Sequence, residues 1–151
     1  MGVRVLVAED EALIALSLAD LLEAEGYDVA LAPDGADALV AARRLGDALA
    51  VLVTDLDMPR MGGEDLIRAL RAERPGLPVV VVTGSAPPGG LEGLRRGAGG
   101  DGPLLLLLKP PCYAELASAL RRAADADPAP RTAGGAAASE PEPPRRVARA
   151  S

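Results

Sequence analysis

Five short apolar runs punctuate the first part of the chain, and each of them stops at polar or turn-forming residues. The runs cover residues 3–8, 27–32, 49–53, 79–82 and 104–108, and the strand predicted for the third of them is 49–54. Runs of this length with such boundaries are typical of strands that are buried on both faces of a sheet. Strands separated by single helices predict parallel pairing through right-handed crossovers. The pattern therefore predicts an α/β fold, a doubly wound five-stranded parallel sheet with helices on both faces.

Four of the predicted helices have ordinary signals, and one does not. We expect helices over 11–25, after a cap at Asp34, over 64–73 and over 113–124. The connection 84–103 instead holds eight of the chain's 17 glycines, together with three prolines. Each interior glycine costs a helix about 1 kcal/mol relative to alanine. The sequence therefore predicts a weak or shortened fourth helix, limited to one or two turns over 91–96.

The chain divides into a domain and a tail. At 151 residues it is large enough for one hydrophobic core, which we assign to residues 1–124. Residues 125–151 contain almost no large apolar side chains, so we expect them to form a disordered Ala/Pro-rich tail. We expect no effector domain within this tail, and hence no direct binding of DNA.

Composition excludes several functions. The chain has a formal net charge of −6, no histidine and one cysteine, Cys112. An acidic chain without a clustered basic face does not favour nucleic-acid binding. The absence of histidine argues against a Cys/His zinc site, and a single cysteine cannot form an intramolecular disulfide. No apolar run approaches the roughly 20 residues of a membrane span, so we expect a cytoplasmic protein that does not bind membranes.

Carboxylates follow two of the predicted strands. Glu9 and Asp10 end the first run, and Asp55 ends the central strand 49–54. Because parallel strands deliver their carboxyl ends to one edge of a sheet, we expect these three side chains to converge there. Their mutual repulsion favours a bound cation, and oxygen ligands with open water positions favour Mg²⁺.

The two remaining strand ends add a hydroxyl and a positive charge. Thr83 follows the fourth run, and Lys109, the only lysine of the chain, follows five leucines. A lysine here is explained either as a structural side chain that reaches water or as the partner of Asp55. A carboxylate nucleophile, Mg²⁺, a hydroxyl and an ammonium together make a site that binds and transfers a phosphoryl group.

This order of motifs resembles the receiver domain of bacterial response regulators. It consists of an acidic pair, Asp55 within DLDMP, Thr83-Gly84 and Lys109-Pro110. The resemblance covers residues 3 to about 124. It implies a flavodoxin-like strand order 2-1-3-4-5. It also implies a stand-alone phosphorelay receiver that catalyses only its own phosphorylation and dephosphorylation.

The resemblance assigns metal ligands and a phosphoacceptor. Asp55 would accept the phosphoryl group and supply one oxygen to Mg²⁺. Asp10 would bind the metal directly, Glu9 would bind it through water, and Asp57 would offer its main-chain carbonyl. The donor would be a histidine kinase or a histidine phosphotransfer protein, and the downstream protein is unknown.

The resemblance also assigns the phosphoryl contacts. Thr83 and Lys109 would hold the phosphoryl oxygens, and the Lys109–Pro110 peptide bond would be cis. Receivers commonly carry an aromatic switch residue three places before the lysine, where this chain has Leu106. We therefore expect the signal to leave through the glycine-rich segment 84–103, which would become more ordered on phosphorylation.

Two alternatives remain at this stage. Asp55-Leu56-Asp57 also fits the nucleophile motif of haloacid-dehalogenase-like phosphatases, although these proteins carry it on their first strand. The second alternative is a receiver-like docking module that takes no phosphoryl group.

Overall fold

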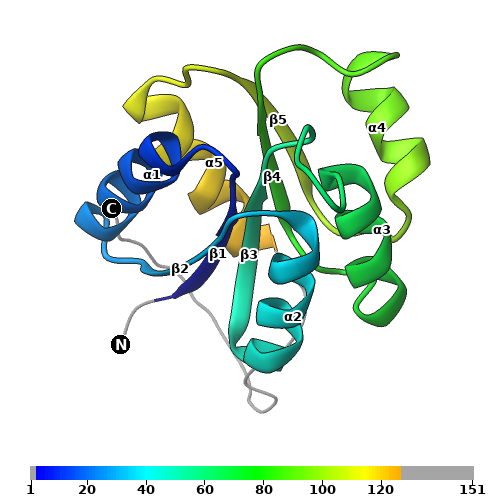
Figure 1. The fold of residues 1–151 in the computed structure, drawn as a ribbon, viewed down its shortest axis with the longest axis horizontal. Coiled ribbons are helices and arrows are strands. Elements are labelled where there is room, and N and C mark those ends of the chain that lie inside the picture. Colours follow the sequence, from blue (N-terminus) through cyan, green and yellow to red (C-terminus); the bar gives the residue numbers. More distant parts are fainter. Residues whose placement is uncertain (1–2, 127–151) are drawn as a thin grey trace.

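Five β-α units follow one another along the chain. The computed structural model describes residues 3–126 (Figure 1). The strands are β1 (Arg4–Ala8), β2 (Asp28–Ala32), β3 (Leu49–Thr54), β4 (Val79–Thr83) and β5 (Leu104–Leu108). The helices are α1 (Ala12–Ala24), α2 (Gly35–Leu45), α3 (Gly63–Glu73), α4 (Gly90–Ala98) and α5 (Tyr113–Ala126), with a 3-10 turn, η1 (Gly46–Ala48), before β3.

The strands form one parallel sheet in the order β2-β1-β3-β4-β5. All four strand pairs are parallel, and β3 lies at the centre between β1 and β4. This confirms the predicted doubly wound sheet and the flavodoxin-like order. Because β1, β3, β4 and β5 all run in one direction, the residues that follow them gather at a single edge.

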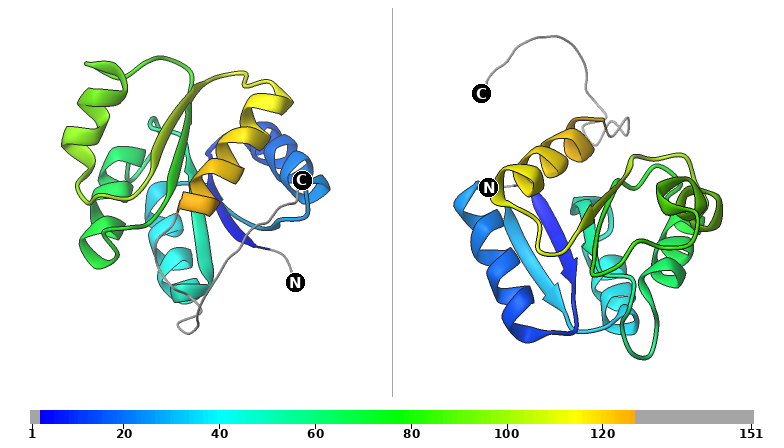
Figure 2. Two further views of the ribbon diagram at one scale, coloured as in Figure 1. Left: turned by 180° about the vertical axis from the view of Figure 1, so that it is seen from behind. Right: turned by 90° about the horizontal axis from the view of Figure 1, so that it is seen from above.

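Helices cover both faces of the sheet and enclose two hydrophobic clusters. Figure 2 shows α1 and α5 on one side, with α2, α3 and α4 on the other. Alternation along the central strands divides their side chains between these clusters. Leu52 points into the cluster under α2, α3 and α4, whereas Val51 and Val53 point into the cluster under α1 and α5. Every residue of β3 is buried, which explains the apolar sequence from Leu49 to Val53.

The helix boundaries differ from the predicted ones by a few residues. The fourth helix is the shortest of the five α-helices in the described chain, as expected, but its nine residues exceed the predicted 91–96. Leu94 and Ala98 are buried, and this packing stabilises a helix that its glycines disfavour. The fifth helix runs to Ala126, two residues past the predicted boundary. The predicted disordered tail otherwise lies outside the described residues.

No helix within residues 3–126 is both long enough and apolar enough to cross a membrane.

A buried arginine joins α3 to the edge of the sheet opposite the strand carboxyl ends. Arg71 is only 4% exposed. Its guanidinium donates to the carbonyl of Leu77 at 2.9 and 3.1 Å, of Gly99 at 3.1 Å and of Pro103 at 2.7 Å. Burial lowers the pKa of Arg71, and the charge of Asp101 partly opposes that shift. One side chain thus holds the turn before β4, the end of α4 and the start of β5.

Replacing Arg71 by methionine should lower the free energy of unfolding by about 2–4 kcal/mol, because the buried carbonyl of Leu77 and the part-buried carbonyls of Gly99 and Pro103 lose their donor. Urea denaturation measures this loss. Arg68→Met is the matched control, since Arg68 lies one turn earlier on α3 and forms exposed ion pairs with Glu64 and Asp65. The control should lose less than about 1 kcal/mol. Equal losses in the two variants would show that the carbonyl contacts of Arg71 are unimportant.

Candidate functional site

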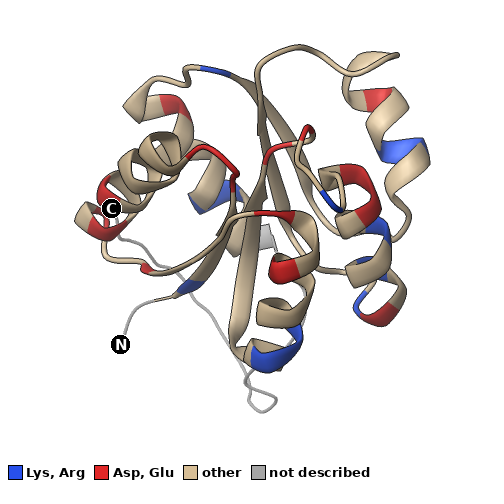
Figure 3. Ribbon diagram, in the orientation of Figure 1, with Lys and Arg blue, Asp and Glu red and all other residues tan. Residues whose placement is uncertain are grey.

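Three carboxylates converge where β1 and β3 end. Glu9, Asp10 and Asp55 each offer an oxygen that lies within 4.8 Å of the other two. Glu9 and Asp55 are 3% and 7% exposed, whereas Asp10 is open to solvent. Figure 3 shows acidic residues gathered around the ends of these two strands. The predicted convergence is therefore present, with two buried carboxylates and one accessible one.

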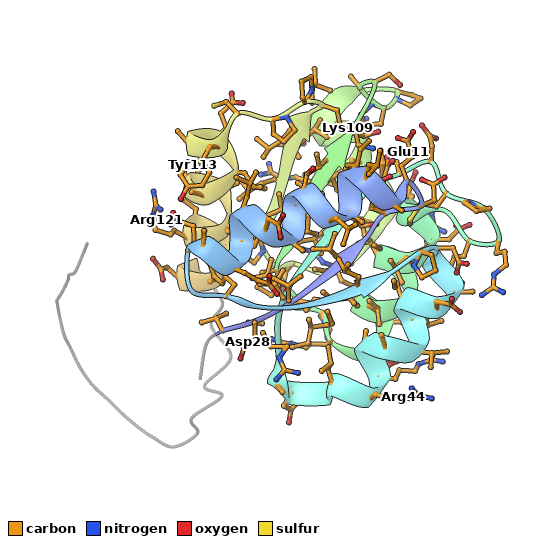
Figure 4. All side chains as sticks on the ribbon, turned by 60° about the vertical axis from the view of Figure 1, so that its left-hand side comes forward. Glu11, Asp28, Arg44, Lys109, Tyr113 and Arg121 are labelled. Atoms are coloured by element: carbon orange, nitrogen blue, oxygen red, sulfur yellow. The ribbon has the colours of Figure 1, made fainter. Side chains whose placement is uncertain are left out.

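Lys109 lies between the two buried carboxylates. Its ammonium nitrogen is 2.7 Å from Glu9 Oε1 and 2.8 Å from Asp55 Oδ2. The side chain reaches the end of the molecule at which α1 begins, beside Glu11 (Figure 4). The pairing with Asp55 agrees with the prediction, and the pairing with Glu9 was not foreseen. The two ion pairs of Lys109 thus connect the end of β5 to the ends of β1 and β3.

Burial and charge act in opposition at this site. Burial raises the pKa of Glu9, although the hydrogen bond from Lys109 and the main-chain N–H of Glu11 oppose the shift. Burial alone would lower the pKa of Lys109, but its hydrogen bonds with Asp55 and Glu9 outweigh this and raise it. A raised pKa in the folded state means that Lys109 contributes stability below its ordinary value of 10.5, and that this contribution is lost as the pH rises through the folded-state value.

The main chain orients Asp55. Its Oδ1 accepts hydrogen bonds from the N–H groups of Leu56 at 2.6 Å and Asp57 at 3.3 Å. Gly63, the first residue of α3, packs so closely behind it that a Cβ there would lie 2.0 Å from the Asp55 carbonyl oxygen. The carboxylate is therefore held on a rigid support, with Oδ2 directed toward Lys109.

Thr83 places an uncommitted hydroxyl at the end of β4. The residue is fully buried, and its Oγ1 has no hydrogen-bond partner among the described residues. The Lys109 N–H donates to the Thr83 carbonyl at 2.9 Å, so the two residues lie side by side. A buried hydroxyl without a partner is costly, so its presence calls for an explanation, and a ligand that accepts its hydrogen bond is one.

The donor set fits Mg²⁺. It consists of carboxylate oxygens only, which are the ligands that this hard cation prefers. Asp10 is accessible, so part of the coordination shell can remain water, as Mg²⁺ requires. A cation would also relieve the repulsion between Glu9 and Asp55 that Lys109 offsets.

Three further features bear on the predicted site. The side chain of Asp57 is exposed and does not belong to the cluster of Glu9, Asp10 and Asp55. The role expected of its main-chain carbonyl stays a prediction. The Lys109–Pro110 peptide bond is cis, as expected. Leu106 is half-buried against the cluster under α3 and α4.

A groove runs beside the site. It has a volume of about 300 Å³ and lies between α1 and the segment that follows β5. Mostly apolar residues line it, namely Leu13, Ile14, Ser17, Leu18, Leu21, Lys109, Pro110 and Pro111. Leu13 at its rim is 81% exposed.

Sequence comparison identifies relatives of this chain. Residues 5–120 match the response regulator receiver domain. The chain is 42% identical over 81 residues to the probable transcriptional regulatory protein TcrX of Mycobacterium tuberculosis, covering 54% of this chain and 34% of TcrX. It is 37% identical over 107 residues to a response regulator receiver protein of Anaeromyxobacter sp., covering 71% of this chain and 42% of that protein.

Solved structures agree with the sequence match. A receiver domain protein from Clostridium thermocellum superposes with a TM-score of 0.73 at 25% identity, covering 83% of this chain and 95% of that one. The chemotaxis protein CheY4 of Vibrio cholerae superposes with a TM-score of 0.71 at 26% identity, covering 82% and 99%.

The match is confined to the domain described above. The chain spans only 34% and 42% of the lengths of the two curated relatives. Within that part, the strand order, the acidic group and the matched residues 5–120 agree with one another. The chain therefore belongs to the response regulator receiver family.

Proposed function

We propose that Asp55 accepts a phosphoryl group in a Mg²⁺-dependent reaction and that the phosphorylated domain signals through contacts with other proteins. The observation that carries this proposal is the fully buried, unpartnered hydroxyl of Thr83, beside a lysine that contacts Asp55. A structural ion pair explains Lys109 and Asp55 but leaves the hydroxyl unexplained. A phosphoryl group on Asp55 gives it an acceptor.

The chain's own residues supply most of the chemistry. An oxygen of Asp55 attacks phosphorus as the bond between phosphorus and the donor nitrogen breaks, and the electron pair of that bond stays on nitrogen. The rigid support of Asp55 fixes its orientation, which favours an in-line attack. Lys109 keeps its ammonium beside the phosphoryl oxygens, and Thr83 donates its hydroxyl to one of them. Mg²⁺, held by Asp10, Asp55 and the Asp57 carbonyl, with Glu9 acting through water, would neutralise further negative charge.

The phosphoryl donor in this proposal is a histidine kinase or a histidine phosphotransfer protein. The sequence contains no histidine, so a phosphohistidine must lie outside these 151 residues. The apolar groove beside Lys109 supports a protein donor, since it offers a docking surface at the site itself. In this proposal the domain catalyses its own phosphorylation and dephosphorylation and acts on no separate substrate. Its cytoplasmic location and its downstream partner stay predictions.

The two alternatives differ from this proposal in what they require. A haloacid-dehalogenase-like phosphatase carries its nucleophile on the first strand, whereas Asp55 follows β3, the third strand. A docking module that takes no phosphoryl group requires only a surface that binds a partner. Whether Asp55 can be phosphorylated therefore distinguishes this alternative from the proposal.

The proposal is tested by incubating the protein with a small phosphodonor and MgCl₂ and then measuring its intact mass. We expect one added phosphoryl group, which hydroxylamine removes because it cleaves acyl phosphates. Chelation of Mg²⁺ should suppress the labelling strongly. An unchanged mass after prolonged incubation would favour the docking module instead.

A further inference from the structure

The loop between β3 and α3 carries Asp57 and is tied down at several points. The N–H of Gly63 donates to the Leu56 carbonyl at 2.9 Å, and the N–H of Met61 donates to the Pro59 carbonyl at 2.7 Å. The N–H of Gly35, at the start of α2, donates to the Met61 carbonyl at 3.1 Å. These contacts hold the far side of the loop against α2 and α3. The Pro59–Met61 contact lies within the segment between Asp57 and Met61, and the side chains of Met58 and Met61 pack against the core, so this segment is already partly fixed.

Arg60 adds a charged contact between this segment and α2. Its Nε lies 3.1 Å from Asp34 Oδ2, and its Nη2 lies 2.8 Å from Asp37 Oδ1 and 3.2 Å from Asp34 Oδ1. Asp34 is the N-cap of α2 and accepts a hydrogen bond from the Asp37 N–H at 2.8 Å. Arg60 therefore contacts both the N-cap residue and the acidic residue in the first turn of α2, a helix that packs on the core.

The backbone of Arg60 adopts an unfavourable conformation where its side chain makes these contacts. Its φ is +66°, the only positive φ of a non-glycine residue among residues 3–126. This region is unfavourable for a residue with a Cβ, and glycine occupies it freely. Strain of this kind persists where the surroundings fix the backbone, and it gathers at functional sites. A glycine here would relieve the strain but could not reach α2.

We infer that Arg60 is a positioning residue for the metal site. Its contacts with Asp34 and Asp37 hold the loop so that the Asp57 main-chain carbonyl keeps its place relative to Asp10 and Asp55. This inference rests on the proposed Mg²⁺ site and adds a residue to it. Arg60 touches neither the metal nor the phosphoryl group in this scheme and acts only through the loop.

Charge and position have opposite effects here, and this makes the inference testable. Removing the positive charge of Arg60 from an acidic region strengthens Mg²⁺ binding if charge alone matters. Removing its contacts with α2 weakens Mg²⁺ binding if loop position matters. The sign of the change in the dissociation constant therefore distinguishes the two effects without any measurement of phosphorylation.

The experiment is a calorimetric titration of the metal-free protein with MgCl₂, for wild type and for Arg60→Gly. We expect the dissociation constant of the variant to rise about threefold. This is less than the loss seen for direct outer-shell partners of a metal, because Arg60 is 58% exposed. Its unfolding midpoint in urea should equal or exceed that of wild type, since glycine suits the positive φ.

Two further variants complete the test. Arg60→Lys keeps the charge and one contact, so its dissociation constant should lie between those of wild type and Arg60→Gly. Arg43→Ala removes another arginine–carboxylate pair between elements, the one with Glu73, and should leave Mg²⁺ binding unchanged.

The outcomes separate the inference from the proposal on which it rests. Unchanged or tighter binding by Arg60→Gly, with normal binding by wild type, overturns the positioning role alone. A lower urea midpoint with an unchanged dissociation constant shows a merely structural residue and also overturns it. Absent Mg²⁺ binding by wild type overturns both the positioning role and the proposed metal site.

Discussion

Replacing Asp55 by asparagine is expected to abolish phosphoryl labelling completely. The amide keeps the size and planar shape of the carboxylate, and its oxygen can still accept hydrogen bonds from the N–H groups of Leu56 and Asp57. It lacks the negative charge and the nucleophilic oxygen that attack on phosphorus requires. The intact mass after incubation with phosphodonor and MgCl₂ should therefore stay that of the unmodified protein.

Asp57→Asn is the matched control for this variant. Asp57 is a second acidic residue of the same loop, but its side chain is exposed and lies outside the carboxylate group. Only its main chain has a proposed role, and the substitution leaves the main chain intact. We expect labelling to persist at a comparable level. Labelling that survives in Asp55→Asn, or that disappears only in Asp57→Asn, would contradict the assignment of the phosphoacceptor.

Lys109→Met should lower the free energy of unfolding by about 3 kcal/mol at neutral pH in metal-free buffer. The substitution leaves two buried carboxylates, Glu9 and Asp55, facing each other without a counter-ion. Methionine fills much of the same space, so lost packing contributes little. Urea denaturation of wild type and variant measures the difference. Phosphoryl labelling should also slow, because no ammonium then faces the phosphoryl oxygens.

The pH dependence of this loss has a definite sign. Burial already raises the pKa of Glu9, and removing Lys109 removes the largest influence that opposes the rise. A raised pKa in the folded state stabilises the fold below the ordinary value of 4.5 and loses this effect as the pH rises through the folded-state value. The difference between Lys109→Met and wild type should thus be smallest near pH 4.5 and should grow above it.

A double variant separates charge repulsion from other causes. Glu9→Gln together with Lys109→Met removes both partners of the Lys109–Glu9 pair and with them the repulsion between Glu9 and Asp55, so part of the stability lost in Lys109→Met should return. Adding MgCl₂ should also narrow the difference between Lys109→Met and wild type, because a bound cation replaces the missing charge. If neither treatment restores stability, the ion pairs of Lys109 are not the cause of the loss.

The fold was largely predictable because strand burial and helix periodicity leave direct marks in this sequence. Five apolar runs became five strands, and single helices between them required parallel pairing. The fourth helix was predicted too short, since propensity counts its glycines but not the burial of Leu94 and Ala98. Packing between distant segments decided the outcome there.

The convergence of the site was predictable for the same reason, whereas its supporting contacts were not. Parallel strands had to bring Glu9, Asp10 and Asp55 to one edge. The grip of Arg60 on α2 depends on a positive φ and on a contact across 26 residues, and neither leaves a periodic signal. The carbonyl contacts of the buried Arg71 were equally invisible, because surface and buried arginines look alike in a helix pattern.

The five leucines of β5 point alternately to the two faces of an edge strand. Leu104 and Leu106 pack on the side of α3 and α4, whereas Leu105 and Leu107 pack on the side of α1 and α5. With selective ¹³C labelling, the methyl resonances of these leucines therefore report separately on the two faces of the sheet, along a strand that leads directly to Lys109. If only the resonances of Leu104 and Leu106 shift on phosphorylation, the signal passes to the side of α4, toward segment 84–103. The chain has two tyrosines and no other aromatic residue, so ring currents contribute little to these methyl shifts and a shift on phosphorylation reports mainly on a change in packing.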